Sequence, residues 1–328
     1  MNEREDELRE LAGALAGLEP SAIDDQLVDL GLIGIGIPEA DGGSGGSLSD
    51  LLVIVEEFAA QAISTSLLDA SCAQWVLHEC GLEVDFTTRS TLKLLNGIGW
   101  DNENPQVITE VPWASQSARV VVVDAVGSVW ALDTTKVTIE PALNVAGEPR
   151  DTLIVDAHAA EELGRIDVAV IGCRLGLLRS AALLGAATAV HRITKQHVRD
   201  RQQFGAPLLR IPAVATQLAV AKTLVLQMQT ALRRAVRAYE SREPAQALTA
   251  VAIARVMATS SAGDVARIGH QLHGAIGTTE EHHLHRATRP LWAWRDDDGL
   301  PWQWQEVVGR AALHDGEPAI WQEITAPT

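Results

Sequence analysis

The distribution of apolar residues along the chain predicts a protein built mainly from helices. After about residue 163 the sequence is rich in alanine and leucine, with few helix breakers inside long blocks. The predicted long helices are residues 174–199, 212–239 and 245–273, and the shorter ones are residues 281–294 and 302–314. Each long block covers about seven or eight helical turns. Because the connections between the blocks are short, we expect neighbouring helices to run antiparallel in a bundle.

The first third of the chain also has helical periodicity, with one interruption. From Leu51 onward apolar positions follow helical spacing, and residues 66–80 favour a further helix. Before them, Ile33, Ile35 and Ile37 alternate with glycines. This alternation predicts an extended segment that enters the loop EADGGSGGS.

Between the two helical regions the pattern changes to short runs of β-branched residues. The runs are RVVVVDAV, SVWAL, KVTIE and DTLIVDA, and turn-forming residues separate them. They predict a small antiparallel sheet domain. The chain as a whole is therefore predicted to be mainly α with a small β domain: a helical N-terminal domain (1–95), a β domain (96–162) and a C-terminal helical bundle (163–328).

Charge narrows the classes of partner. Lys and Arg number 26 against 43 Asp and Glu, a formal net charge of −17, which repels phosphate backbones and anionic lipid headgroups. The longest apolar region, residues 166–190, contains Arg174 and Arg179, which disfavours a membrane span. The charged start MNEREDELRE does not resemble a secretory signal. We expect a cytoplasmic protein that binds neither nucleic acid nor membrane.

Common chemical motifs give weak signals. The sequence has no GxGxxG or GxxxxGK[ST] phosphate loop and no GxSxG nucleophile elbow. Glu280 and His283 have the ExxH spacing of di-iron bundles, but a second such pair is missing. We therefore predict no metal, and expect the histidine-rich segment to form a helix end or an interface. The tryptophans crowded near the C-terminus favour packing or subunit contact; they are Trp292, Trp294, Trp302, Trp304 and Trp321.

Three segments, in this order along the chain, resemble motifs of the flavin-dependent acyl-CoA dehydrogenase family. They are LGLIGIGIPEADGGSGGS with the following EEFA, RDRQQFGAPLLRIPA, and QLHGAIGTTEEHHLHR. The spacing from Arg201 to Gln271 is also that of the family. The family's fold is a helical N-terminal domain, a small β domain and a C-terminal bundle, which agrees with the pattern above. The resemblance thus implies an acyl-CoA dehydrogenase-like fold.

The resemblance also implies a cofactor, FAD, shared across a subunit boundary. The implied binding residues for its adenine and pyrophosphate half are Arg201, Phe204, Gln271, His273, Gly274 and Ala275. The residue types suit this task, because Arg201 offers a planar fork of donors to phosphate. Phe204 offers a flat apolar contact, and at Gly274 the backbone can approach the cofactor closely.

The family's catalytic features are less complete. Its reaction needs a carboxylate base at the substrate's α carbon, and the position of one usual glutamate falls at Asp298, which is one methylene shorter. A second usual position falls at Leu175, and a glutamine that contacts the flavin is replaced by Pro212. The β-domain segments that hold the flavin ring are not recognisable in GWDNENPQVITEVPWAS. The resemblance therefore covers the residues that bind the adenine half of FAD. It does not cover those that hold the flavin ring and supply the base.

This asymmetry resembles the short partner subunit of the heterotetrameric (α2β2) acyl-CoA dehydrogenases of actinobacterial steroid degradation. We therefore expect a subunit that completes the FAD site of a longer acyl-CoA dehydrogenase chain, which carries the base. An acyl-CoA, by analogy a steroid side-chain thioester, would be the substrate, and an electron-transfer acceptor would reoxidise the flavin. Two alternatives stay open: a self-sufficient homotetrameric dehydrogenase that uses Asp298, and a scaffold relative without flavin, of which a metal-binding bundle is one form.

Overall fold

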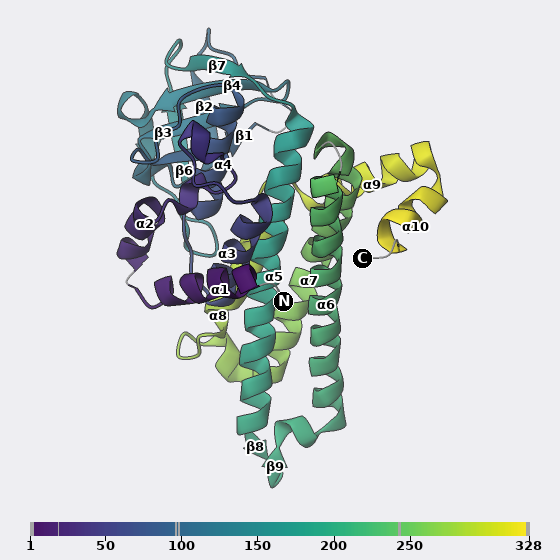
Figure 1. Cartoon of the computed structure of the whole chain (residues 1–328). Helices are drawn as coiled ribbons and strands as arrows, with labels where there is room; N and C mark the ends of the chain where they lie inside the picture. Colours follow the sequence, from purple (N-terminus) through teal and green to yellow (C-terminus); the bar gives the residue numbers. More distant parts are fainter. Residues whose placement is uncertain (1–2, 19, 96, 98, 242–243, 326–328) are drawn as a thin grey trace. The chain divides into compact units, whose positions relative to one another are not determined.

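The computed structural model describes residues 3–18, 20–95, 97, 99–241 and 244–325. The chain divides into two compact units (Figure 1). The first unit comprises Met1–Ile54 and Ser64–Leu175, and the second comprises Val55–Ile63 and Gly176–Thr328. Each unit has its own architecture.

The first unit begins with helices, as the sequence predicts. They are α1 (Glu3–Leu15), α2 (Pro20–Asp29), the start of α3 (Leu48–Ala60) and α4 (Leu67–Glu79). The predicted extended segment at residues 33–37 is wrong, because Leu32–Gly34 is a turn of 3-10 helix. Gly31 and Gly36 have φ of 68° and 87°, which bends the backbone on either side. Ile33, Ile35 and Ile37 are nevertheless buried.

The sheets of the first unit are formed by seven strands. They are β1 (Ser90–Leu94), β2 (Gln106–Pro112), β3 (Arg119–Val123), β4 (Ser128–Asp133), β5 (Thr138–Glu140), β6 (Arg150–Val155) and β7 (Glu161–Arg165). One sheet has the order β1-β3-β4-β7 and the other β2-β6-β5. The pairs are antiparallel except β1 and β3, which run parallel, so the first sheet is mixed rather than antiparallel as predicted. The strands begin before residue 96 and continue past residue 162.

The core of this β region is aliphatic. Val120, Val122, Leu132, Leu153 and Val155 are fully buried and pack into one cluster. They alternate along their strands with residues on the opposite face, which is the spacing that the valine-rich runs predict.

The second unit is a helical bundle. Its helices are most of α5 (Val168–Asp200), then α6 (Pro212–Ser241), α7 (Leu248–His273), α8 (Leu284–Asp296), α9 (Pro301–Asp315) and α10 (Glu317–Thr325). In Figure 1, α5, α6 and α7 run side by side along most of their lengths. As predicted, Pro212 is the first residue of α6, where its missing N–H costs nothing.

Helix α5 has the length and hydropathy of a membrane span. However, 78% of its most apolar window is buried inside the protein. Arg174 and Arg179, which lie in this helix, are 2% and 3% exposed. Helix α5 therefore packs as the central helix of a protein core.

Candidate functional site

A two-stranded hairpin joins α5 to α6 at one end of the bundle (Figure 1). Its strands are β8 (Gln202–Gln203) and β9 (Ala206–Pro207), and the two residues between them, Phe204 and Gly205, have φ of 56° and 77°. Positive φ at both positions is the geometry of a tight hairpin turn, which suits Gly205 and strains a bulky residue such as Phe204. Phe204 is nevertheless 92% exposed at the tip. The fold of this chain therefore gives the ring no packing role.

The second predicted segment is the turn that follows α7, here called the 271–275 turn. Helix α7 ends at His273, and Gly274 has φ 64° and ψ −146°, a conformation that glycine alone adopts easily. Gly277 is equally constrained, because a Cβ there would lie 2.7 Å from the Cβ of His273. Gln271, Gly274 and Ala275 are exposed. The turn thus presents backbone and small side chains to the surface.

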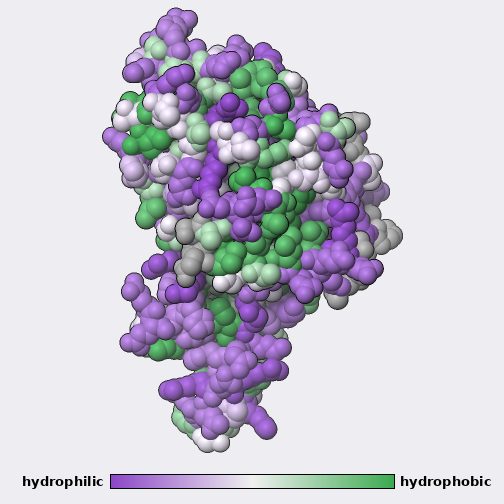
Figure 2. Space-filling model, turned by 60° about the vertical axis from the view of Figure 1, so that its left-hand side comes forward, coloured by the Kyte–Doolittle hydropathy of each residue, from purple (hydrophilic) through white to green (hydrophobic). Residues whose placement is uncertain are grey.

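Arg201 and the 271–275 turn line the same cavity, although about 70 residues separate them in the sequence. The cavity has a volume of about 740 Å³ and is open to solvent. Among the described residues, its lining includes Gln203, Gln217, His197 and His282 but no Asp or Glu. Phe204 is not among the lining residues. Seen at the bottom of Figure 2, this end of the bundle is covered mainly by hydrophilic residues.

The absence of carboxylates from the lining of this cavity is informative, because the chain as a whole carries a net charge of −17. Arg201 supplies a permanent positive charge, and amide side chains and imidazoles supply further hydrogen-bond donors. Such a lining suits a phosphate-bearing ligand.

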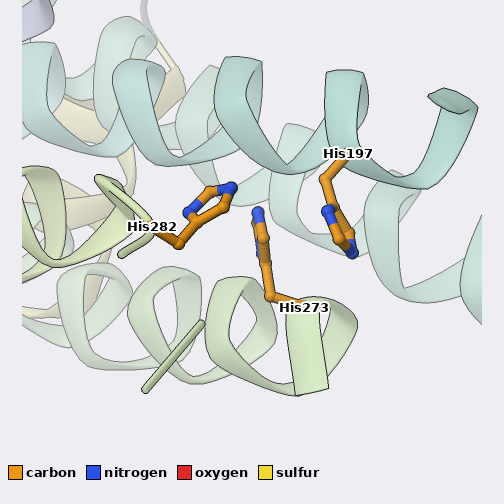
Figure 3. Close-up of side chains that lie close together, drawn as sticks. All are labelled: His197, His273 and His282. Carbon is orange, nitrogen blue, oxygen red and sulfur yellow. The ribbon is translucent and has the colours of Figure 1, made fainter. Parts of the chain in front are cut away.

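Three histidines converge beside Arg201 (Figure 3). His197 comes from the last turns of α5, His273 from the end of α7, and His282 from the non-helical segment before α8. The rings of His197 and His273 stack with centroids 4.2 Å apart, and those of His273 and His282 lie 4.6 Å apart. The sequence analysis identifies His273 but neither of the others. The sequence signals were that His282 lies in the histidine-rich segment and that His197 lies one helical turn before Arg201.

Burial lowers the pKa of each of these imidazoles. The pKa of His273 falls to about 4, mainly through desolvation. Burial first, and then the positive charge of Arg201, lower the pKa of His197. Burial and the neighbouring histidines lower the pKa of His282. At neutral pH the three rings are therefore uncharged.

Asp298, the candidate base, is held by a buried arginine. Its carboxylate Oδ2 accepts hydrogen bonds from Nε and Nη2 of Arg179, both at 2.8 Å, and the neighbouring Asp297 lies 3.4 Å from Nη1. Asp298 has φ 56°, so the backbone is strained to make this contact. The other base position, Leu175, is a buried leucine.

A second arginine holds the same loop through hydrogen bonds to backbone carbonyl oxygens. Arg255 is fully buried and donates from Nη2 to the carbonyl oxygens of Trp294 and Asp297, at 3.0 and 2.6 Å. Two buried guanidinium groups thus bind the WRDDDG segment. Their contacts hold the loop in place.

The sequence matches two family profiles. They are acyl-CoA dehydrogenase, N-terminal domain, over residues 5–84, and acyl-CoA dehydrogenase, C-terminal domain, over residues 173–293. The chain belongs to the acyl-CoA dehydrogenase family. The fold predicted from the sequence is therefore confirmed at the level of the family.

Among relatives of this acyl-CoA dehydrogenase family member is acyl-CoA dehydrogenase IpdE2 of Mycolicibacterium smegmatis. It is 27% identical over 257 residues, which cover 78% of this chain and 76% of that protein. Solved structures with the same fold include the Tcur3481-Tcur3483 steroid ACAD G363A variant, with a TM-score of 0.82, 23% identity and coverage of 95% and 98% of the two chains. The ChsE4-ChsE5 complex from Mycobacterium tuberculosis matches with a TM-score of 0.82, 19% identity and coverage of 95% and 98%.

Proposed function

We propose that this chain is a subunit of a heteromeric, FAD-dependent acyl-CoA dehydrogenase. In this proposal it binds the adenine and pyrophosphate half of an FAD whose ring, together with the catalytic base, belongs to a longer partner subunit. The reaction is the α,β-desaturation of an acyl-CoA thioester, for which bound flavin supplies the hydride acceptor. The proposal places the complex in the cytoplasm, with an electron-transfer acceptor to reoxidise it.

The observation that carries the proposal is the cavity without carboxylates that Arg201 shares with the 271–275 turn. A diphosphate needs fixed donors and no competing negative charge. The Arg201 guanidinium, the Gln271 amide and the backbone around Gly274 meet this need on one surface. The same residues are those that the family resemblance assigns to the nucleotide end of FAD.

Phe204 supports the idea that the cofactor lies at a boundary between subunits. A phenyl ring exposed by 92% at a strained hairpin tip gains nothing from this chain's own fold. Large exposed aromatic rings of this kind are characteristic of residues that become buried on association. We assign Phe204 to contact with the cofactor or with the partner that holds it.

The arrangement of the acidic loop supports a base in the partner. A general base must reach the substrate's α proton with a free oxygen. Oδ2 of Asp298 is bound by Arg179, and the loop that carries Asp298 is anchored by Arg255, so the carboxylate is held in place within this chain. At the other family position Leu175 has no acid–base chemistry. In our proposal Asp298 is therefore structural.

The choice of substrate class rests on the relatives. Two structures of the same fold are a steroid ACAD and the two-protein ChsE4-ChsE5 complex, and on this basis we propose a steroid-type acyl-CoA for this chain. For this chain the inference is by analogy.

The test is to purify the chain alone and together with a longer acyl-CoA dehydrogenase subunit, and to measure flavin absorbance and acyl-CoA turnover. The proposal expects a colourless chain alone and a yellow, active complex. Arg201→Ala should weaken FAD retention by about 10- to 100-fold, because a hydrogen bond to a charged group contributes about 1.5–3 kcal/mol. Arg210→Ala is the matched control, since Arg210 is exposed on the same connection but does not line the cavity.

Other outcomes identify the alternatives. If the chain alone is yellow and is bleached by an acyl-CoA, it is a self-sufficient enzyme. If Asp298→Asn then abolishes turnover while flavin content is kept, the base is in this chain. If the chain stays colourless with every partner, it is a scaffold relative.

A further inference from the structure

The three histidines beside the cavity have an arrangement that anion binding alone does not explain. One nitrogen atom from each of His197, His273 and His282 lies within 4.8 Å of the corresponding atoms of the other two. The rings come from three separate segments; those of His197 and His273 lie face to face, and His282 meets His273 at an angle (Figure 3). We propose that these three side chains form a binding site for a divalent transition-metal ion of the zinc class. This site shares the cavity proposed for FAD, and His273 is also one of the implied FAD-binding residues, but metal binding does not depend on the flavin.

His273 is the fixed ligand of the site. Its Nδ1 lies 2.7 Å from the carbonyl oxygen of Gly269, which can only accept, so Nδ1 carries the hydrogen. The lone pair is then on Nε2, which is buried and has no hydrogen-bond partner. Metal-binding histidines typically donate their other N–H to a backbone carbonyl in this way. A metal ion would use the lone pair that the protein leaves unpaired.

The other two ligands differ in freedom. His197 is held on α5 and stacks on His273, whereas His282 lies in the non-helical segment before α8. A tetrahedral zinc ion with N–Zn distances of about 2.0–2.1 Å needs nitrogen atoms about 3.4 Å apart. The set must therefore contract by up to about an ångström and a half. His197 must also rotate out of its stack on His273 so that the ring nitrogens of both face the ion, and His282 must move closer to them.

One existing contact opposes that movement. The backbone N–H of Leu284 donates to Nδ1 of His282 at 3.1 Å. If Nε2 of His282 binds a metal, Nδ1 must carry a hydrogen and the contact with Leu284 is lost. This contact is a single part-buried hydrogen bond at the start of α8, and its loss is a cost of metal binding.

The chemistry of the set selects the metal. Three neutral imidazoles and no oxygen ligand suit Zn²⁺, Co²⁺, Ni²⁺ or Cu²⁺ and not Mg²⁺ or Ca²⁺. A further cavity of about 730 Å³ borders His197 and His282 and is open to solvent, which gives an ion an entry path. A fourth position stays free for water or an anion.

The ExxH pair noted in the sequence is not part of the proposed metal site. Glu280 and His283 are exposed, and the set that the structure brings together lacks both. Arg201 and Asp200, which carry opposite charges, line the adjoining cavity together with His197 and His282. Their opposite signs leave the site without a large net repulsion for a cation.

The experiment titrates the full-length chain, freed of metal with a chelator, with Co²⁺ and then with competing Zn²⁺. We expect one Co²⁺ per chain with the visible absorption of a tetrahedral site, displaced by Zn²⁺. His282→Gln and His273→Leu should each weaken binding by more than about 100-fold, because loss of even an outer-shell partner costs about 10–100-fold. His314→Ala is the control, since that side chain is 87% exposed on α9.

The variants also separate this proposal from the flavin proposal. Arg201→Ala should keep Co²⁺ binding while it loses FAD, because the guanidinium is not a ligand. If His273→Leu fails to fold, His282→Gln still decides, since His282 lies outside the helices. The proposal is overturned if wild-type chain binds no stoichiometric Co²⁺, or if His282→Gln and His314→Ala bind it equally to wild type.

Discussion

At the scale of single residues, the imidazole of His273 makes the stability of the fold depend on pH. Its pKa is about 4 in the folded chain against an ordinary value of 6.5, so the unfolded chain takes up a proton first as pH falls. The stability that His273 contributes should therefore be fully present above about pH 6.5 and be lost as the pH falls from there to about pH 4. We expect this group to account for about 2 kcal/mol, allowing for partial contact with water.

The measurement is chemical denaturation of the metal-free chain at both ends of this pH range. The His273→Leu variant should lose less stability on acidification than wild type, because it has no proton to gain at this position. His314→Leu should behave as wild type, since its side chain is exposed. Equal acid sensitivity in wild type and His273→Leu would contradict the assignment.

The other residue-scale lesson concerns what the sequence can and cannot indicate. The motifs placed Arg201 and the 271–275 turn in one site, and the structure brings them to one cavity. His197 belongs to no motif, and His282 lies in the third motif segment without an assigned role, because their meeting depends on how the end of α5 packs against the segment after α7. Asp298 occupies the position of one usual catalytic glutamate of the family, but the motif could not reveal that its carboxylate pairs with Arg179.

At the scale of secondary-structure elements, the long helices were predictable because their signals are local. Breakers such as Pro212 and Gly274 mark ends within a residue or two, and alanine-rich blocks fill the interior. The parallel pairing of β1 with β3 was not predictable, since it depends on contacts between strands distant in sequence. At residues 33–37 the glycines overrode the alternation of isoleucines.

Helix packing in the second unit gives an element-scale prediction. A Cβ at Gly185 of α5 would lie 2.1 Å from the carbonyl oxygen of Glu56 and 2.8 Å from the Cβ of Ala59, both on α3. Gly185→Ala should therefore destabilise the fold by about 2–4 kcal/mol, because the backbones must move apart. The helix-propensity gain of alanine does not offset this cost.

Gly172→Ala, on the same helix, is the matched control. A Cβ there would meet no atom within 4 Å. Since alanine is the better helix former, this variant should be neutral or more stable by up to about 1 kcal/mol. Thermal melts of the two variants measure the difference, and similar melting temperatures would show that α3 and α5 do not approach this closely.

At the scale of the whole molecule, the chain leaves several large apolar side chains exposed, which suits the proposed association with a partner. The exposed apolar groups include Trp302 and Trp321 near the C-terminus as well as Phe204 at the hairpin tip, exposed by 57%, 54% and 92%. The sequence predicted packing or subunit contact for the crowded tryptophans, and a contact role for Phe204. It could not predict which apolar residues remain outside the core, because that depends on the complete fold.

Phe204 gives the prediction that tests association directly. Because the ring has almost no contact with its own chain, Phe204→Ser should leave the melting temperature of the isolated chain unchanged. In the complex, burial of a phenyl ring contributes about 2–3 kcal/mol, so the variant should bind its partner or retain FAD about 30- to 100-fold more weakly. Val126→Ser is the control, since Val126 is 62% exposed at a turn of the β region. If Phe204→Ser assembles as tightly as Val126→Ser, the hairpin tip lies outside the interface, and the cofactor must be held without it.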